Sequence, residues 1–129
     1  EARPDLVCLC GYLRLLELAD WMHGRVMNIH PALLPRHGGR GMFGMRVHEA
    51  VLAAGETETG CSVHFVDEQY DHGPTILQRT CPVHDGDSAS DLAERVFALE
   101  CETYPRAISM VAGGEVRLID GQAVSSTAS

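Results

Sequence analysis

The order of apolar and polar residues predicts strands and a helix in the first part of the chain. The stretch 5–10 is a continuous apolar run that ends at a glycine, as is typical of a strand buried on both faces of a parallel sheet. A short helical pattern covers 15–23, and a second strand is predicted over 25–30. Prolines 31 and 35 then end that strand.

Further elements are predicted in the middle of the chain. Residues 36–44 form a glycine-rich loop, and apolar residues at helical spacing predict a helix over 44–54. Apolar and polar residues alternate over 61–66, which predicts a strand, and 75–83 is its predicted partner. The intervening Tyr-Asp-His-Gly-Pro stretch (70–74) has the composition of a turn.

The last third predicts one long helix and a short strand. Ser88-Ala-Ser-Asp91 resembles a helix-capping motif, with Asp in place of the usual Glu. The apolar face of this helix is predicted to comprise Leu92, Val96, Leu99 and Thr103. Pro105 is expected to kink or restart the helix, and two glycines at 113–114 to end it. A strand is expected over 115–119 and a disordered tail at the end of the chain.

Composition limits the class of protein. The 129 residues fit one domain, and 45% hydrophobic residues are normal for a globular fold. The net charge of −8 and the lack of a basic run argue against nucleic acid or an anionic membrane as a partner. No apolar stretch approaches the roughly 20 residues that span a bilayer. The chain begins at Glu1, close to its first apolar run, so we expect a missing N-terminal portion.

The five cysteines suggest a cytoplasmic protein with reduced thiols. Their number is odd, their spacing is irregular, and most lie in apolar runs, so we expect buried, unpaired side chains. Cys8 and Cys10 have the wrong spacing for a zinc knuckle, and no second pair lies nearby. We therefore expect no metal.

The candidate chemistry lies in two segments. Asn28 and His30 would point to the same face of the strand 25–30, at its C-terminal end, where open α/β sheets bind ligands. Asp71 would add a carboxylate from a turn. An amide, an imidazole and a carboxylate can carry out acyl transfer. The alternatives are an Asn bonded to nearby backbone, a buried His bonded to backbone, and an ordinary turn Asp.

These segments resemble a known family. Asn28-Ile-His-Pro-Ala-Leu-Leu-Pro35, Val63-His-Phe-Val66 and Asp71-His-Gly-Pro74 with Gln78 are similar to the signature of folate-dependent formyltransferases. Further similar segments are Gly11-Tyr-Leu-Arg-Leu-Leu16, Gly38-Gly-Arg-Gly-Met-Phe-Gly44, Val47-His-Glu-Ala50, and Glu100 followed by Tyr104-Pro105. The resemblance runs from about residue 4 to residue 119 in chain order.

The resemblance implies a doubly wound, Rossmann-like α/β fold with a mostly parallel sheet and flanking helices. The chain resembles the C-terminal portion of that catalytic domain, over 1–120, with 121–129 as the tail. The family's early glycine- and serine-rich turn, which holds the phosphate of the nucleotide substrate, has no counterpart here. Binding of a phosphorylated substrate is therefore in doubt.

The activity implied by the resemblance is transfer of a formyl group from 10-formyltetrahydrofolate to the amine of glycinamide ribonucleotide, in purine biosynthesis. Asn28 and His30 would donate to the oxyanion that forms on the formyl oxygen. Asp71 would raise the pKa of His30 and order a water molecule that relays protons. The partners expected are these small molecules, with a homodimer as a possibility.

The resemblance also implies binding residues. Leu13, Arg14, Leu15 and Leu16 would form one wall of the folate pocket, and the turn Val66, Asp67 and Glu68 another. Glu100 would contact the ribose hydroxyls of the nucleotide, unless it is a solvated helix residue.

His64 would support the site or bind water, with a satisfied core histidine as the equal alternative. His72 receives no role, and four other histidines are expected on the surface or in loops: His23, His37, His48 and His84. The loop 38–44 is expected either to move over the site or to act as a connector.

Two alternative functions are consistent with the resemblance. One is hydrolysis of the formyl group, although that branch of the family usually has a second histidine where Pro31 stands here. The other is a truncated, non-catalytic partner that binds folate. The missing phosphate turn favours the second alternative.

Overall fold

The computed structural model describes residues 6–10, 18, 22–119 and 121–125 of the chain. In chain order its elements are β1 (Val7–Cys10), β2 (Val26–His30), α1 (Met45–Ala53), β3 (Glu58–Phe65), β4 (Thr75–Pro82), α2 (Ala89–Ala112), β5 (Val116–Ile119) and β6 (Gln122–Ser125). The predicted strands and the two later helices are thus confirmed to within a few residues. The predicted helix 15–23 lies mostly outside the described residues.

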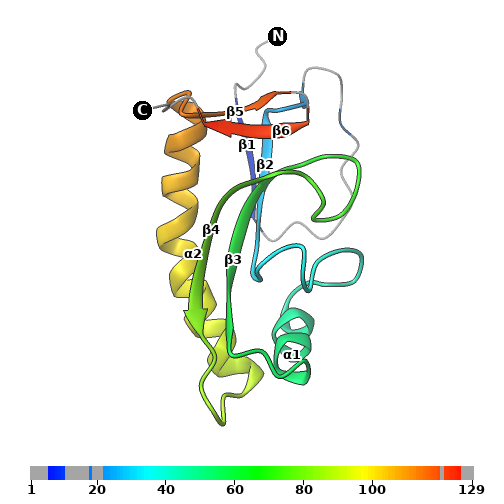
Figure 1. Ribbon diagram of the computed structural model, residues 1–129, viewed down its shortest axis with the longest axis vertical. Helices are drawn as coiled ribbons and strands as arrows, with labels where there is room; N and C mark the ends of the chain where they lie inside the picture. Colours follow the sequence, from blue (N-terminus) through cyan, green and yellow to red (C-terminus); the bar gives the residue numbers. More distant parts are fainter. Residues whose placement is uncertain (1–5, 11–17, 19–21, 120, 126–129) are drawn as a thin grey trace.

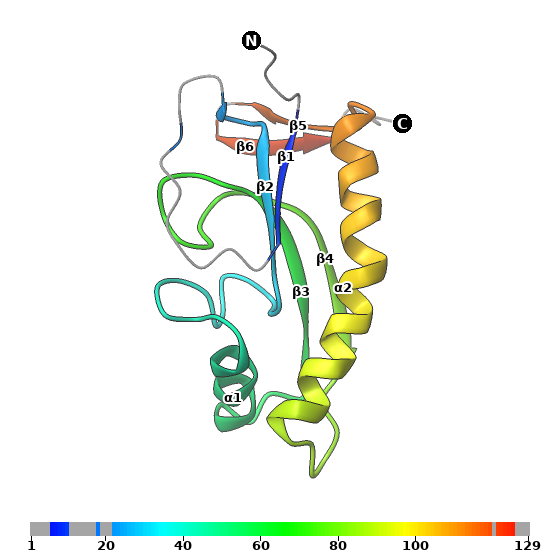
Figure 2. The same ribbon diagram turned by 180° about the vertical axis from the view of Figure 1, so that it is seen from behind.

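The main sheet has the strand order β1-β2-β3-β4, and β5 and β6 form a separate two-stranded sheet. The long helix α2 runs beside β3 and β4 and contacts both, whereas α1 lies near the far end of the sheet from β5 and β6 (Figure 1). This arrangement confirms an α/β fold with flanking helices. The same layers are seen from behind in Figure 2, where α2 lies in front of β4.

The prediction of a mostly parallel sheet is wrong for the described part. Only β1 and β2 pair in parallel, whereas the β2–β3 and β3–β4 pairs are antiparallel. The turn 66–74 explains the last pair, since two strands joined by a short turn must run in opposite directions. Gly73 is needed in this turn because a Cβ there would lie 1.7 Å from the carbonyl oxygen of Phe65.

The core lies between the sheet and α2 and is built from strand residues that face the apolar side of the helix. Its most buried members include Met27, Ile29, Cys61, Val63, Phe65, Leu92 and Val96. The predicted α2 face is correct, since Leu92, Val96 and Thr103 are buried and Leu99 is partly buried. This packing holds β2 and β3 in fixed register under the loops that follow them.

The alternation of apolar and polar residues in β3 is not matched by alternating burial, because every residue from Thr59 to Phe65 is buried. One face of the strand packs in the core. The other is covered by the loop after β2: Ser62 Oγ accepts from the Leu34 amide at 3.0 Å and donates to the Ala32 carbonyl at 2.7 Å. A strand covered on both sides shows continuous burial.

The prediction that β1 is buried on both faces is wrong. Cys8 and Cys10 are exposed, and Val7 and Leu9 are partly buried, so one face of this strand is open to solvent. The prediction of buried cysteines fails for the same reason. All five thiols are free, but only Cys61 is fully buried, and Cys101 is exposed on α2.

Helix α2 begins with the predicted capping box. Ser88 Oγ accepts from the Asp91 amide at 3.0 Å, and the Asp91 carboxylate accepts from the Ser88 amide at 3.1 Å. The helix continues through Pro105 to Ala112, so the predicted restart does not occur. Tyr104 anchors the helix to the sheet, since its hydroxyl lies 2.5 Å from the Leu9 carbonyl oxygen.

The end of the chain differs from the predicted disordered tail. Residues Gln122–Ser125 form β6, which pairs antiparallel with β5 in register Val116 with Ser125. The sequence did not predict this strand, because its residues are mostly small or polar, alternate only weakly between apolar and polar, and are little buried. Residues 126–129 lie outside the described part.

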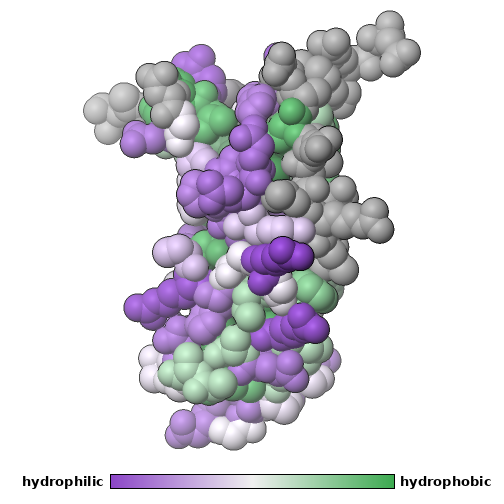
Figure 3. Space-filling model, turned by 90° about the vertical axis from the view of Figure 1, so that its right-hand side faces the viewer, coloured by the Kyte–Doolittle hydropathy of each residue, from purple (hydrophilic) through white to green (hydrophobic). Residues whose placement is uncertain are grey.

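The surface is mixed in character. On the face shown in Figure 3, hydrophilic areas are interspersed with smaller hydrophobic ones. Within the described part of the chain, neither helix has the length and apolar character needed to cross a membrane.

The capping box yields a stability prediction. Ser88→Ala should lower the free energy of unfolding by about 1 kcal/mol, because the Asp91 amide loses its acceptor. The matched control is Ser90→Ala, an exposed serine in the same helical turn. Urea denaturation followed by circular dichroism should separate the two variants, and equal midpoints would contradict the assigned cap.

Candidate active site

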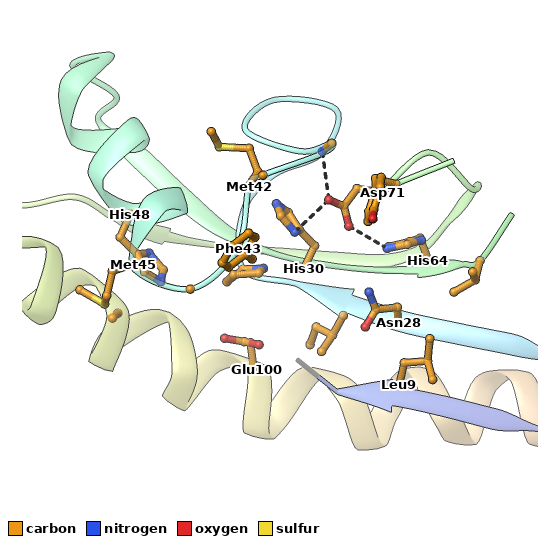
Figure 4. Close-up of a pocket in the computed structure, with 18 of the residues that line it drawn as sticks. Leu9, Asn28, His30, Met42, Phe43, Met45, His48, His64, Asp71 and Glu100 are labelled. Carbon is orange, nitrogen blue, oxygen red and sulfur yellow. Dashed lines mark hydrogen bonds and ion pairs between the residues drawn. The ribbon is translucent and has the colours of Figure 1, made fainter. Parts of the chain in front are cut away.

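A cavity of about 390 Å³ opens where β2 ends, between the glycine-rich loop, the β3–β4 turn and α2. The ends of parallel β1 and β2 point to it, which is the expected ligand position in an open α/β sheet. Figure 4 shows Asn28, His30, His64, Asp71 and Glu100 around this space. The structure therefore brings together the three residues predicted to act jointly, although two come from β2 and one from a turn 41 residues later.

Asn28 and His30 lie on the same face of β2, as their spacing predicted. In the sheet, Asn28 is opposite Leu9 of β1 and His64 of β3. Its side-chain oxygen is buried and has no hydrogen-bond partner. In Figure 4 its amide nitrogen is turned toward His64 and Asp71. An Asn bonded to nearby backbone would have its oxygen satisfied, so this geometry favours a ligand-binding amide.

His30 is only 4% exposed and makes two polar contacts. Its Nε2 lies 2.7 Å from the His37 carbonyl oxygen, and its Nδ1 lies 3.4 Å from Asp71 Oδ2. A carbonyl oxygen only accepts, so Nε2 carries a hydrogen and donates it. Nδ1 is then the ring position that can gain or lose a proton toward Asp71.

Asp71 acts to raise the pKa of His30, as expected, but the net pKa of His30 is lowered. Burial lowers the pKa of this imidazole, and the opposing effects of the Asp71 carboxylate and the His37 carbonyl do not fully offset it. The sequence reveals the charge partner but not the depth of burial. A histidine with a lowered pKa is mostly neutral at neutral pH and therefore able to accept a proton.

Asp71 lies in the β3–β4 turn with a φ of 50° and is partly buried. Burial alone would raise the pKa of this carboxyl group, but its contact with His64, the nearby His30 and the Gly39 amide together lower it. The Gly39 amide donates to Oδ2 at 3.0 Å. Asp71 is thus a carboxylate at neutral pH, held by three groups.

His64 stands behind Asp71. Its Nδ1 donates to the Phe65 carbonyl oxygen at 2.9 Å, and its Nε2 lies 3.7 Å from Asp71 Oδ1. Nε2 is buried and has no hydrogen-bond partner, since 3.7 Å is too long for a hydrogen bond to Asp71. His64 therefore touches the carboxylate directly, in agreement with the predicted supporting position, while its role in catalysis stays a prediction.

Glu100 reaches the cavity from α2, so it is not a solvated helix residue. Burial raises the pKa of its carboxyl group to about 6. It can therefore exist in either protonation state near neutral pH and can accept or donate a hydrogen bond. This behaviour suits recognition of a hydroxyl-bearing ligand.

The predicted folate-binding residues are placed only in part. Leu13, Arg14, Leu15 and Leu16 lie outside the described residues. Val66 lines the cavity, whereas Asp67 and Glu68 do not.

The side chains of Asp67 and Glu68 are engaged elsewhere. Asp67 bonds the Gln69 amide at 2.8 Å and the His72 ring at 2.6 Å, and Glu68 lies 3.7 Å from His23. The turn contributes Gln69 and Tyr70 to the cavity instead.

Sequence reasoning missed His48, which was assigned to the surface. It is 5% exposed on α1, lines the cavity, and has an unpartnered Nδ1. Burial and the neighbouring His30 lower its pKa. The available signal was its position on α1 beside Val47 and one turn before Val51, both of which are buried.

The loop after β2 is more than a connector. Its Gly39 amide binds Asp71, and its apolar residues Met42 and Phe43 line the cavity. Gln78 of β4 fastens its start, donating to the Leu34 carbonyl at 3.0 Å and to Ser62 Oγ at 2.8 Å. Among the described residues, no cluster of three or more His, Cys, Asp or Glu has the geometry to hold a metal ion.

Comparison with known proteins places this chain in one family. The sequence matches the family described as formyl transferase over residues 1–108. The trifunctional purine biosynthetic protein adenosine-3 of Bos taurus is 46% identical over 121 residues, which are 92% of this chain and 11% of that protein. The phosphoribosylglycinamide formyltransferase of Escherichia coli is 42% identical over 127 residues, which are 92% of this chain and 58% of that protein.

Solved structures agree with the sequence match. Glycinamide ribonucleotide transformylase 1 from Symbiobacterium toebii superposes with a TM-score of 0.82 at 38% identity, covering 94% of this chain and 56% of that chain. A formyltetrahydrofolate deformylase from Pseudomonas syringae, at 24% identity and a TM-score of 0.71, shares the fold. This chain spans 11% to 58% of the length of the relatives named above whose sequences were compared.

Glu100 yields a pH-dependence prediction. A carboxyl group with a raised pKa in the folded state binds more protons than in the unfolded state, so its contribution to stability falls as pH rises from 4.5 to about 6. Glu100→Gln should therefore be more stable than the parent chain at pH 8, by about 1–2 kcal/mol. The difference should shrink toward zero at pH 4. Urea denaturation at both pH values measures it.

The matched control for this prediction is Glu94→Gln, on the exposed face of the same helix. It should change stability little at either pH. If Glu100→Gln and the parent chain have the same free energy of unfolding at pH 8, burial does not destabilise the ionised form of Glu100.

Proposed function

Because this chain belongs to the formyl transferase family, we propose that it transfers a formyl group from 10-formyltetrahydrofolate to the amine of glycinamide ribonucleotide. Relatives of this chain are named phosphoribosylglycinamide formyltransferase and glycinamide ribonucleotide transformylase, and the motifs of the chain resemble those of folate-dependent formyltransferases. The observation that carries the proposal is the meeting of Asn28, His30 and Asp71 in one cavity, where His30 and Asp71 form an imidazole–carboxylate pair and the side-chain oxygen of Asn28 is buried without a partner.

The cavity fits a folate in size and character. Its volume of about 390 Å³ falls in the usual range for small-molecule sites. Apolar side chains such as Leu9, Met42 and Val66 line it, and the polar groups gather near the end of β2. The flat pterin of a folate and the formyl-bearing N10 next to it need this combination of an apolar slot and a few fixed polar groups.

The reaction forms one C–N bond and breaks another. The substrate amine attacks the formyl carbon, and an oxyanion develops on the formyl oxygen. Collapse of this tetrahedral intermediate breaks the bond to N10 of the folate and yields the formamide and tetrahydrofolate. One proton leaves the amine nitrogen and one reaches N10. The proton balance of the reaction is therefore the movement of one proton from the amine nitrogen to N10.

Asn28 serves as the oxyanion donor. Both nitrogens of His30 already face acceptors, the His37 carbonyl and the Asp71 carboxylate, whereas the amide nitrogen of Asn28 is turned into the site. A preorganised donor of this kind is typically worth about 2.7–4 kcal/mol of the barrier. Direct donation from His30 would require its Nε2 hydrogen to leave the His37 carbonyl.

The His30–Asp71 pair holds the proton in transit. Neutral His30 can accept the amine proton at Nδ1, and Asp71 stabilises the imidazolium that forms. Direct contact or one bridging water then returns a proton to N10. The same pair would serve a water molecule as nucleophile, so hydrolysis differs only in what occupies the acceptor side.

A substrate assay tests the proposal. The chain supplied with 10-formyltetrahydrofolate should release tetrahydrofolate only when glycinamide ribonucleotide is present, and the nucleotide should gain the formyl group. Asp71→Asn should lower kcat by about 10²–10⁴-fold, the usual contribution of general acid–base catalysis, because the His30 imidazolium loses its stabilising carboxylate, while folate binding persists. Asp67→Asn is the matched control, because it removes a carboxylate four residues away whose side chain points outside the cavity.

The other outcomes are distinct. Tetrahydrofolate formed equally without the nucleotide would replace the proposal by the hydrolase. Folate binding without any turnover would replace it by the non-catalytic partner.

A further inference from the structure

Two backbone positions in the described chain have an unusual conformation, and both touch His30. Among the residues that the structure describes, only His37 and Asp71 combine a side chain with a positive φ, at 57° and 50°. Such a conformation costs on the order of 1 kcal/mol or more and persists only where other contacts enforce it. One supplies the carbonyl on His30 Nε2, and the other supplies the carboxylate near Nδ1.

The His37 side chain has a partner that enforces its conformation. Its Nε2 lies 3.0 Å from Glu56 Oε2, with side-chain exposures of 17% for His37 and 22% for Glu56. Glu56 follows the C-terminal end of α1, in the short connection to β3, and is 19 residues away in sequence. Arg36 also contacts Glu56 at 3.3 Å, but its side chain is 73% exposed and contributes little order.

Residues 37–39 contact both members of the catalytic pair, His30 and Asp71. The His37 carbonyl accepts from His30 Nε2 at 2.7 Å, and the Gly39 amide donates to Asp71 Oδ2 at 3.0 Å. These two contacts fix the ring plane of His30 and the carboxylate plane of Asp71 relative to one another. A displacement of residue 37 would therefore act on His30 and Asp71 together.

We propose that Glu56 and His37 are positioning residues for the reaction. Glu56 holds the His37 ring, the ring holds residue 37 in its left-handed conformation, and the His37 carbonyl thereby keeps the hydrogen of His30 on Nε2. Nδ1 is then left facing Asp71 as the site of proton exchange. Neither Glu56 nor the His37 side chain touches the cavity in which the reaction occurs.

The His37 carbonyl controls which nitrogen of neutral His30 carries the hydrogen. Without the His37 carbonyl, neutral His30 could also place its hydrogen on Nδ1, toward Asp71, and would then be unable to accept a proton there. The positioning residues raise the fraction of His30 in the reactive tautomer. This consequence for turnover rests on the proposed function, whereas the effect on His30 itself does not.

Glu56→Ala tests the inference. Nitrogen-15 NMR of the histidine rings in the full chain should show His30 as the Nε2-protonated tautomer in the parent and as a mixture of tautomers in Glu56→Ala. The His30 pKa should also fall, because the His37 carbonyl raises it in the parent. Glu56→Gln keeps an acceptor for the His37 ring and should restore most of the parent spectrum. Glu58→Ala, two residues away and exposed, is the matched control and should leave His30 unchanged.

Activity provides the second measurement. Glu56→Ala should lower kcat by about tenfold, the effect of one lost hydrogen bond, with KM for the folate within about twofold. A His30 spectrum and kcat that match the parent in Glu56→Ala would overturn the positioning role. If no variant or parent shows formyl transfer but the His30 spectrum still responds to Glu56, the positioning stands and the proposed function fails.

Discussion

The site depends on holding a carboxylate and an imidazole together in a place with little water. Two unit charges 3.4 Å apart attract by about 5 kcal/mol at the effective dielectric constant of a protein, and burial costs several kcal/mol for each ion. These two effects are of similar size and opposite sign, so the surroundings of each group decide which one prevails. Burial prevails for His30, whose pKa is lowered, and the surrounding donors prevail for Asp71, whose pKa is also lowered. Neutral His30 can accept a proton from an amine, and the ionised Asp71 beside it stabilises the imidazolium that forms.

The fold brings the imidazole and the carboxylate together from segments that are far apart in the sequence. β2 carries Asn28 and His30 to the cavity. The last residue of β3, Phe65, pairs with Met27 near the start of β2, and the turn that follows places Asp71 3.4 Å from His30. The Phe65 amide bonds the Pro74 carbonyl at 2.9 Å and closes that turn. The core beneath fixes the register, so a slip of one residue in β2 would turn both functional side chains away from the cavity.

The elements and the set of residues that meet at the site were largely predictable from sequence. Period-two alternation in a short strand was enough to place Asn28 and His30 on one face, and Ser88 with Asp91 was enough to start α2. Depth was not predictable. His48 was assigned to the surface and Cys8 to the interior, because burial depends on which neighbouring segments cover a residue. The tether from Glu56 to His37 was also invisible, since nothing in the spacing of those residues marks a contact across 19 positions.

In the proposed reaction Asn28 binds the formyl oxygen itself. Infrared difference spectroscopy tests this most directly, with a stable 10-formyl folate analogue carrying carbon-13 in the formyl carbonyl. Hydrogen bonding in the site should shift the labelled carbonyl band to lower frequency than in water, and Asn28→Ala should remove most of that shift. A bound carbonyl band at or above its position in water, or one that is indifferent to Asn28→Ala, would contradict the proposed oxyanion site.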